Sequence, residues 1–293
     1  METYTLLIPE GYETPTSDDI RRAKRWTLLR NRNAAVLSDR ITEILQDAIR
    51  EMVRIAYKYN CTPENFQFSQ DKKLREDIAA LLSEMEDEIL ELVEIYSLNE
   101  TADTERRSLL LPWLAALSSK GNKGLKATLH ARVRQFMYDT EAQIAAMKLA
   151  GYGQTKATNR SVSTMHAVYT APEVLAAFKR KSAAMYINSH GTHYGNVGLS
   201  SSGANNVEAF GRQTATIAWM KSQLLDFVDR GAAGYYQMRG SAYECDICDS
   251  QVGLHIGNFV NDLYPHNNCM CFRVPVWVKE GRVTTRNTTN KTE

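Results

Sequence analysis

The sequence predicts a mainly α-helical protein with a small Cys/His-clamped α/β or β-rich module near its C-terminus. Long segments carry apolar residues at spacings of three and four, which is the period of an amphipathic helix. After residue 235 the chain changes to short, turn-rich segments with more β-forming residues. Four of the five cysteines fall between residues 245 and 271, which marks this last part as a separate module.

The N-terminal part is predicted to form a long helix after an extended, turn-rich segment over residues 1–16. Ser17 is a plausible N-cap, and Asp18 and Asp19 follow in the first turn, where the helix dipole favours anions. Apolar residues at helical spacing extend the helix to about residue 59. These residues are Ile41, Leu45, Ala48, Met52 and Ile55.

A second long helix is predicted over residues 71–96, after a break of about ten residues at 60–69. Its glutamates would cover the outer face, and its apolar stripe consists of Ile78, Leu82, Met85, Ile89, Leu92 and Val93. Two long helices joined by so short a break predict an antiparallel helical hairpin. Cys61 lies in the break, far from the other cysteines, and is expected to be a packing residue.

The middle of the chain is predicted to be helical with interruptions. Helices are expected over 104–117 with a kink or boundary at Pro112, over 125–149, from about 172 through the basic run 179–181, and over 207–230. Loop with short elements is expected over 151–170, and an exposed connector over 189–206. A strand is expected over 272–278. The predicted regions are an N-terminal helical hairpin (1–103), a basic helical middle (104–234), the Cys/His module (235–278) and a disordered tail (279–293).

Charge is unevenly distributed along the chain although the net charge is near zero. Residues 71–100 contain ten acids and three bases, whereas residues 106–181 contain thirteen bases and three acids. This asymmetry predicts different partners for the two segments, with polyanions favoured by the basic one. Solvated helix faces that neutralise one another are the alternative interpretation.

No segment predicts an association with the membrane. The N-terminus lacks the pattern of a secretory signal, and no apolar run approaches the roughly 20 residues that a bilayer requires. A reducing compartment is therefore expected, which favours metal binding over disulfides for the cysteine cluster.

The cysteine cluster has the composition of a zinc site. A C-x2-C pair is followed after seventeen residues by H-x2-C-x-C, so five candidate ligands compete for four tetrahedral positions. Cys245, Cys248 and Cys269 are the first choices, and His266 and Cys271 compete for the fourth position. A cluster of buried reduced cysteines, or a redox-labile disulfide pair, is the alternative.

A resemblance to a known family rests on the residues around this cluster. The segments are Tyr235-Tyr-Gln-Met-Arg239-Gly-Ser-Ala-Tyr-Glu-Cys245-Asp-Ile-Cys248 and Pro265-His266-Asn-Asn268-Cys269-Met-Cys271. They resemble the C-terminal signature of the phage Mu F-like minor head proteins, which ends in H-P-N-C-R-C. Asn267 stands in place of the family's proline and Met270 in place of its arginine. The resemblance is specific over about 235–275, weaker from about 125, and absent from the first hundred residues.

The resemblance implies a structural role in the head of a tailed phage or prophage. Such a protein would assemble in the host bacterial cytoplasm and lie in the virion, at the capsid interior or the portal vertex. The expected partners are the portal protein and the major capsid protein, and the basic region 106–181 would contact DNA non-specifically through phosphates. Zinc is the expected cofactor, with a structural role, and no enzymatic activity is expected.

Two other functions are compatible with a Cys/His module. One is a metal-dependent nuclease with a Cys-clamped ββ-metal-like module, which would need a free histidine as general base; His266 lies among the cysteines and is itself a candidate ligand. The other is a zinc-bearing DNA-binding protein. No catalytic residues are assigned. The remaining polar candidates are expected to be neither ligands nor catalytic: His190, His193, His255, Asp246 and Asp249.

Overall fold

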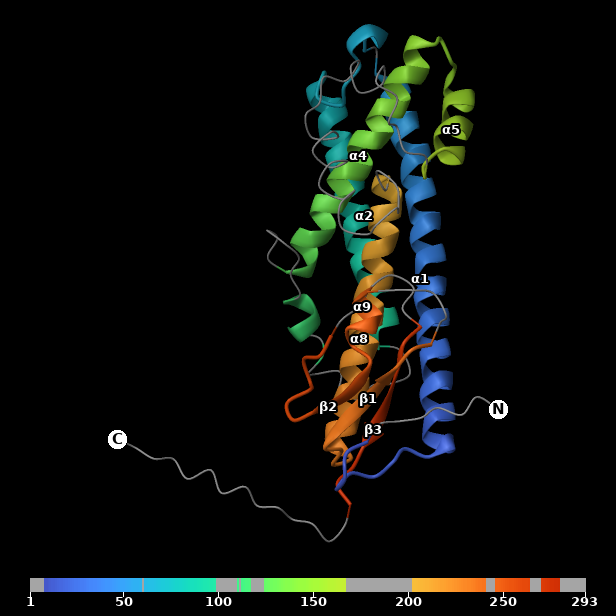
Figure 1. Ribbon diagram of the computed structural model, residues 1–293. Helices are drawn as coiled ribbons and strands as arrows, with labels where there is room; N and C mark the ends of the chain where they lie inside the picture. The colour runs from blue at the N-terminus through green and yellow to red at the C-terminus, as the bar shows by residue number, and fades with distance from the viewer. Residues whose placement is uncertain are drawn as a thin grey trace. The chain divides into compact units, whose positions relative to one another are not determined.

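The structure is a computed structural model that describes residues 8–59, 61–98, 110, 112–116, 124–166, 202–240, 246–263 and 270–279. Its helices and strands follow in the order α1 (Ser17–Lys58), η1 (Pro63–Asn65), α2 (Lys72–Leu98), α4 (Leu125–Leu149), α5 (Gln154–Ser163), α8 (Gly203–Asp229), β1 (Gly234–Met238), α9 (Asp246–Asp249), β2 (Gly253–Ile256) and β3 (Phe272–Val276) (Figure 1). The predicted fold class is confirmed: the chain is mainly helical, with a small antiparallel sheet near its C-terminus.

The chain divides into two compact units. One consists of residues Asn33–Ala218, and the other combines Met1–Arg32 with Trp219–Glu293. We call them the helical unit and the sheet unit. Helices α1 and α8 each contribute residues to both units, because the division falls within each of them.

A capping box begins α1. The Thr16 hydroxyl accepts a hydrogen bond from the Asp19 backbone N–H (3.2 Å), and the Asp19 carboxylate accepts one from the Thr16 backbone N–H (3.0 Å). The residue that caps the helix is therefore Thr16, one position before the predicted Ser17. These two reciprocal hydrogen bonds satisfy two backbone N–H donors that the start of a helix otherwise leaves without a partner.

Helices α1 and α2 form the predicted antiparallel hairpin, and hydrogen bonds mark both of its ends. Near the connecting segment, the Tyr59 hydroxyl donates to the Asp77 carboxylate (2.7 Å). At the opposite end, the Asn33 side-chain amide donates to the Tyr96 carbonyl (2.7 Å). Asn33, in the middle part of α1, thus lies beside the end of α2, as an antiparallel pair requires.

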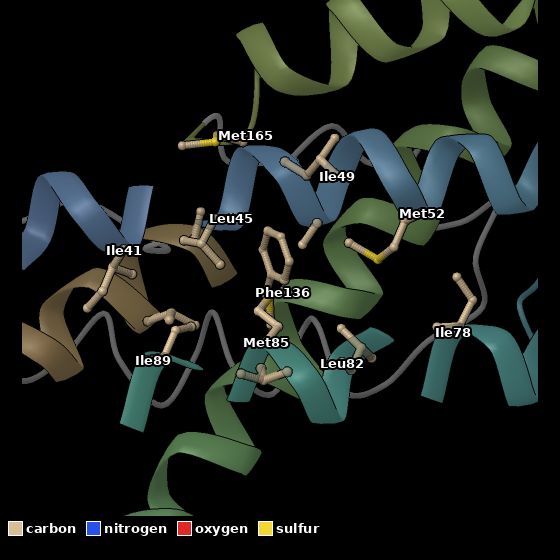
Figure 2. Close-up of a cluster of buried hydrophobic side chains, with 14 of the residues drawn as sticks. Ile41, Leu45, Ile49, Met52, Ile78, Leu82, Met85, Ile89, Phe136 and Met165 are labelled. Carbon is tan, nitrogen blue, oxygen red and sulfur yellow. The ribbon is translucent and has the colours of Figure 1, made fainter. Parts of the chain in front are cut away.

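The core of the helical unit is organised around Phe136 of α4. Figure 2 shows its ring between apolar side chains of α1 and of α2. Phe136 itself is 2% exposed. The neighbouring residues that Figure 2 labels on α1 are Ile41, Leu45, Ile49 and Met52, and those on α2 are Ile78, Leu82, Met85 and Ile89. This confirms that the two predicted apolar stripes face a shared core, and that α4 supplies the third wall.

Helix α8 begins four residues before the predicted position 207. The Ser202 hydroxyl accepts a hydrogen bond from the Asn205 N–H (3.2 Å), and the Asp139 carboxylate accepts one from the Gly203 N–H (2.6 Å). A Cβ added at Gly203 would lie 2.3 Å from the backbone of Phe136, so only glycine permits this approach. The predicted start of this helix was wrong because Asp139 and Phe136, which contact Gly203, belong to another helix, α4.

Desolvation makes the Asp139 carboxyl electrostatically unusual. Desolvation raises its pKa from 3.8 to about 6, although its hydrogen bonds with the Gly203 N–H and the Gln135 amide act in the opposite direction. Between pH 3.8 and about 6 the folded protein therefore binds a proton that the unfolded chain has released. It follows that the free energy of unfolding decreases as the pH rises through this interval.

Asp139→Asn should remove this pH dependence. The neutral amide can still accept from Gly203 N–H, and the Gln135 amide can rotate to present its oxygen. We expect the variant to match the wild type near pH 4 and to be more stable above pH 6, by up to about 3 kcal/mol. Urea titrations at several pH values would measure the difference, and a difference that does not change with pH would contradict the assignment.

Glu208 and Glu141 are buried carboxylates of the helical unit, and each has defined partners. Glu208 of α8 accepts from the Thr42 hydroxyl (2.7 Å) and lies 2.7 Å from Nε2 of His166. Glu141 of α4 accepts from the Phe68 N–H (2.7 Å). These bonds compensate the desolvation that burial imposes on each charged group. They also attach α8 and the segment after η1 to the rest of the unit.

Some predictions lie outside the described residues. These are most of helix 104–117, the helix from about 172 to 181, the connector up to residue 201, and the tail from residue 280. Helix α5 lies in the segment predicted as loop with short elements, and Ala157 and Ser161 are its buried residues. Within the described residues, none of the helices combines the length and the apolar character of a membrane span.

Candidate metal centre

The sheet unit is built on three antiparallel strands in the order β2-β1-β3. In the central strand β1, Tyr235 is opposite His255 of β2 and Pro275 of β3. Pro275 is tolerated because β3 is an edge strand. Past the end of β3, the N-terminal segment joins the sheet: the Glu13 N–H donates to the Trp277 carbonyl (2.8 Å), and the Lys279 N–H donates to the Gly11 carbonyl (2.9 Å).

The two faces of the sheet differ in chemistry. One face is apolar and packs with Ala23 of α1; its residues are Tyr236, Met238, Phe272, Val274 and Val276. Alternate positions of the same strands carry Tyr235, Gln237 and Arg273, and Tyr235 packs with Leu224 and Phe227 of α8. The alternation follows from the two-residue period of a strand. The sheet is therefore enclosed by one end of α1 and one end of α8.

Arg273 links the polar positions of the sheet to the segment after β2. Its guanidinium donates to the Gln237 side chain (3.2 Å) and to the Asp262 carbonyl (2.6 Å). The same group lies 5.0 Å from the centre of the Tyr235 ring, a cation–π distance. Arg273 is 2% exposed, so these contacts replace the water that a guanidinium otherwise binds.

Tyr235 and His255 stack in parallel, with ring centroids 4.6 Å apart. The Tyr235 hydroxyl donates to the Asp262 carboxylate (3.2 Å), and Nε2 of His255 lies 2.8 Å from the Gln251 carbonyl. Both His255 and Asp262 are thus engaged within the module.

Cys248 and Cys271 lie against each other. Cys248 is in the short helix α9, Cys271 directly precedes β3, and each is 5% exposed. One residue comes from the C-x2-C half of the motif and the other from the H-x2-C-x-C half. The fold therefore brings the two halves of the predicted site together. Two thiolates bound to the same zinc ion lie about 3.8 Å apart, which is also a packing contact.

The backbone closes tightly beside these cysteines. A Cβ added at Gly240 would lie 1.8 Å from the carbonyl oxygen of Met270, so a side chain at residue 240 would displace the chain there. The Asn31 side-chain amide of α1 donates to the Met270 sulfur (2.7 Å). Met270 stands between two predicted ligands, Cys269 and Cys271. Gly240, two residues after β1, and Asn31 of α1 thus fix the backbone that carries the second half of the motif.

A cationic side chain accompanies the thiols. Arg239 forms an ion pair with Asp249 of α9. Hydrogen bonding to Asp249, followed by the charge of Asp249 and of the Cys248 and Cys271 thiolates, raises the pKa of Arg239. A guanidinium at this place stabilises thiolates, which are the form that binds metal.

The other predicted ligands, Cys245, His266 and Cys269, lie outside the described residues, as do His190 and His193. Within the described residues, no three side chains of His, Cys, Asp or Glu gather into a group that could hold a metal ion. The described part of the predicted site is therefore one pair of thiols with an adjacent arginine.

Cys61 behaves as predicted for a packing residue. It belongs to the helical unit and lies partly buried against the apolar core. Burial raises the pKa of its thiol, which disfavours the thiolate.

Sequence reasoning missed Arg239 and Arg273. The sequence does give an indication for Arg273, because it is the one arginine among the apolar residues of the strand Phe272–Val276. If both faces of the sheet are covered, such an arginine must have buried partners. The sequence around Arg239 gives no such indication, because its partner Asp249 lies ten residues later in the chain, in the helix α9.

The chain matches no protein-family model, no curated protein and no solved structure. Function is therefore inferred from the residues of the chain itself.

Proposed function

We propose that the chain is a minor head protein of a tailed phage or prophage, which acts in head assembly at the portal or the capsid interior. The observation that carries the proposal is the signature around Cys245, Cys248, His266, Cys269 and Cys271, which resembles that of the phage Mu F-like proteins. The contact between Cys248 and Cys271 supports it, because the two halves of the signature then serve one site.

The module is proposed to bind one zinc ion with four ligands. The packing of Cys271 on Cys248 favours Cys271 over His266 as the fourth ligand, beside Cys245 and Cys269. A site closed by four protein ligands stabilises the fold and leaves no open position for a substrate. The zinc would supply folding energy to a module whose sheet has three short strands.

Any contact of region 106–181 with DNA is proposed to be non-specific and to be made through phosphates. Lys126 forms an ion pair with Asp87 (3.0 Å). Lys148 donates to the Ala56 carbonyl (3.1 Å), and burial lowers its pKa. These two lysines are already engaged within the helical unit, so any DNA contact would depend on the other bases.

Co-expression with any portal protein and major capsid protein that are encoded beside this gene tests the proposal. We expect the tagged chain to retain the portal or the capsid protein through affinity and size-exclusion steps. The portal protein of an unrelated phage is the matched control and should not be retained.

A nuclease would behave differently in the same preparation. Plasmid nicking that requires Mg²⁺ and is lost in His266→Ala, with neither head protein retained, would overturn the proposal. Sequence-specific DNA binding that survives moderate salt would favour a zinc-bearing DNA-binding protein instead.

A further inference from the structure

Helix α1 exposes a basic and apolar stripe near its start. The α1 stripe consists of Arg22, Arg25, Leu28, Leu29 and Arg32, all exposed. Leu28 is 59% exposed and Leu29 45%. Their spacings of three, four and seven residues place them on one face of the helix. The opposite side of the same segment carries buried residues, such as Ala23 and Thr27, so the stripe is the outer face of a packed helix.

The chemistry of the α1 stripe indicates an acidic protein surface as its partner. Three arginines within eleven residues attract an anionic partner. Phosphate contacts alone would leave Leu28 and Leu29 in water, whereas a protein face with an apolar side chain among its acids would cover them. The partner surface should therefore be an acidic stripe that contains an exposed apolar residue.

Helix α2 has such a surface. The α2 stripe consists of Glu84, Glu88, Glu91 and Ile95, all exposed, with Ile95 50% exposed. Their spacings of four, three and four residues again place them on one helix face. At a rise of about 1.5 Å per residue, each stripe is about 15 Å long. The two stripes are thus matched in length, opposite in charge and alike in carrying exposed apolar groups.

We propose that the α1 stripe of one copy of this chain docks on the α2 stripe of a second copy. The arginines of the first copy face the glutamates of the second, and Leu28 and Leu29 pack on Ile95. Because the two surfaces differ, the association is head-to-tail, and it forms a ring where the rotation between copies closes. This inference does not depend on the proposed function, since portal binding can succeed or fail independently of self-association.

Exposed ion pairs are individually weak and are screened by salt, so the association should be concentration- and salt-dependent. We expect the full chain, at high micromolar concentration and low salt, to have a mean mass above its 33.1 kDa monomer mass in sedimentation experiments. High salt should shift it toward the monomer.

Charge-reversed variants test the pairing of the two stripes. In Arg25→Glu/Arg32→Glu both stripes are acidic, and in Glu84→Arg/Glu91→Arg both are basic. Each variant alone should associate at least about tenfold more weakly than the wild type, because like charges then face each other. An equimolar mixture of the two variants should associate again, since each stripe then finds an opposite partner. Circular dichroism confirms that the variants fold.

Matched controls lie elsewhere on the surface. Leu149→Ser changes a leucine that is 61% exposed but outside the stripe, and it should leave the association unchanged, whereas Leu28→Ser/Leu29→Ser should weaken it. A wild type that stays monomeric at high concentration and low salt would overturn the proposal. So would a mixture of the two reversed variants that fails to associate, or a stripe that instead binds anionic vesicles or DNA while the chain stays monomeric.

Discussion

Cys248→Ser should deprive the protein of zinc and unfold the sheet unit, while residues 33–218 retain their own melting transition. The wild type should contain about one zinc per chain by elemental analysis. Cys248 lies buried against Cys271, and a serine hydroxyl is a poor replacement for a thiolate ligand. Structural zinc contributes about 10–16 kcal/mol of apparent binding free energy in small zinc modules, so its loss should dominate the stability of a three-stranded sheet. Hydrogen exchange at β1 and β3 would locate the unfolding.

A chelator provides the second arm of this experiment, and Cys61→Ser provides the control. The chelator should reproduce the effect of Cys248→Ser on the wild type. Cys61 packs in the helical unit, so its replacement should leave the zinc content unchanged. Protein purified with reductant that carries no zinc, and whose melting is unchanged by chelator, would refute the metal site.

Phe136→Ala should destabilise the helical unit by about 3–5 kcal/mol. The ring is 2% exposed and lies between the apolar residues of α1 and α2 (Figure 2), so its removal leaves a cavity that three helices line. The loss exceeds the transfer free energy of the side chain because the surrounding backbone relaxes only in part. Urea unfolding followed by circular dichroism at 222 nm would measure it.

Leu149→Ala on the same helix is the matched control. Leu149 is 61% exposed, so this truncation should change stability by no more than about 0.5 kcal/mol. An equal loss in both variants would show that the loss does not depend on the burial of the side chain, and that Phe136 does not organise the core.

The periodic parts of the fold were predictable from the sequence. Helix α4 has the predicted bounds 125–149, and α1 ends within a residue of the prediction. Both are long, and their apolar residues recur at helical spacing, so that local pattern and tertiary packing agree. The start of α8 was missed because Gly203 is helical only through contacts with Asp139 and Phe136 of another helix. Strand β1 was not predicted, since its buried Gln237 obscures the apolar pattern.

The part of the candidate site that is defined by the spacing of residues in the sequence was predictable. The C-x2-C and H-x2-C-x-C pattern identified Cys248 and Cys271, which the fold brings together. Spacing gives no information on side chains that act across the fold. Arg239 is paired through α9, and Asn31 reaches Met270 from α1, 239 positions earlier in the chain. Both contacts arise from packing between distant segments.

The pairing of Gly11 and Glu13 with residues 277–279 has a consequence during synthesis. The ribosome makes the N-terminal segment and the first turns of α1 well before their partners in β3 and beyond. Residues 33–218 can meanwhile emerge as a continuous stretch and fold, because contacts of shorter sequence separation form sooner. The sheet and its thiol pair are then completed last, so we expect metal capture to follow the folding of the helices, and a chain released early to be helical but without its module.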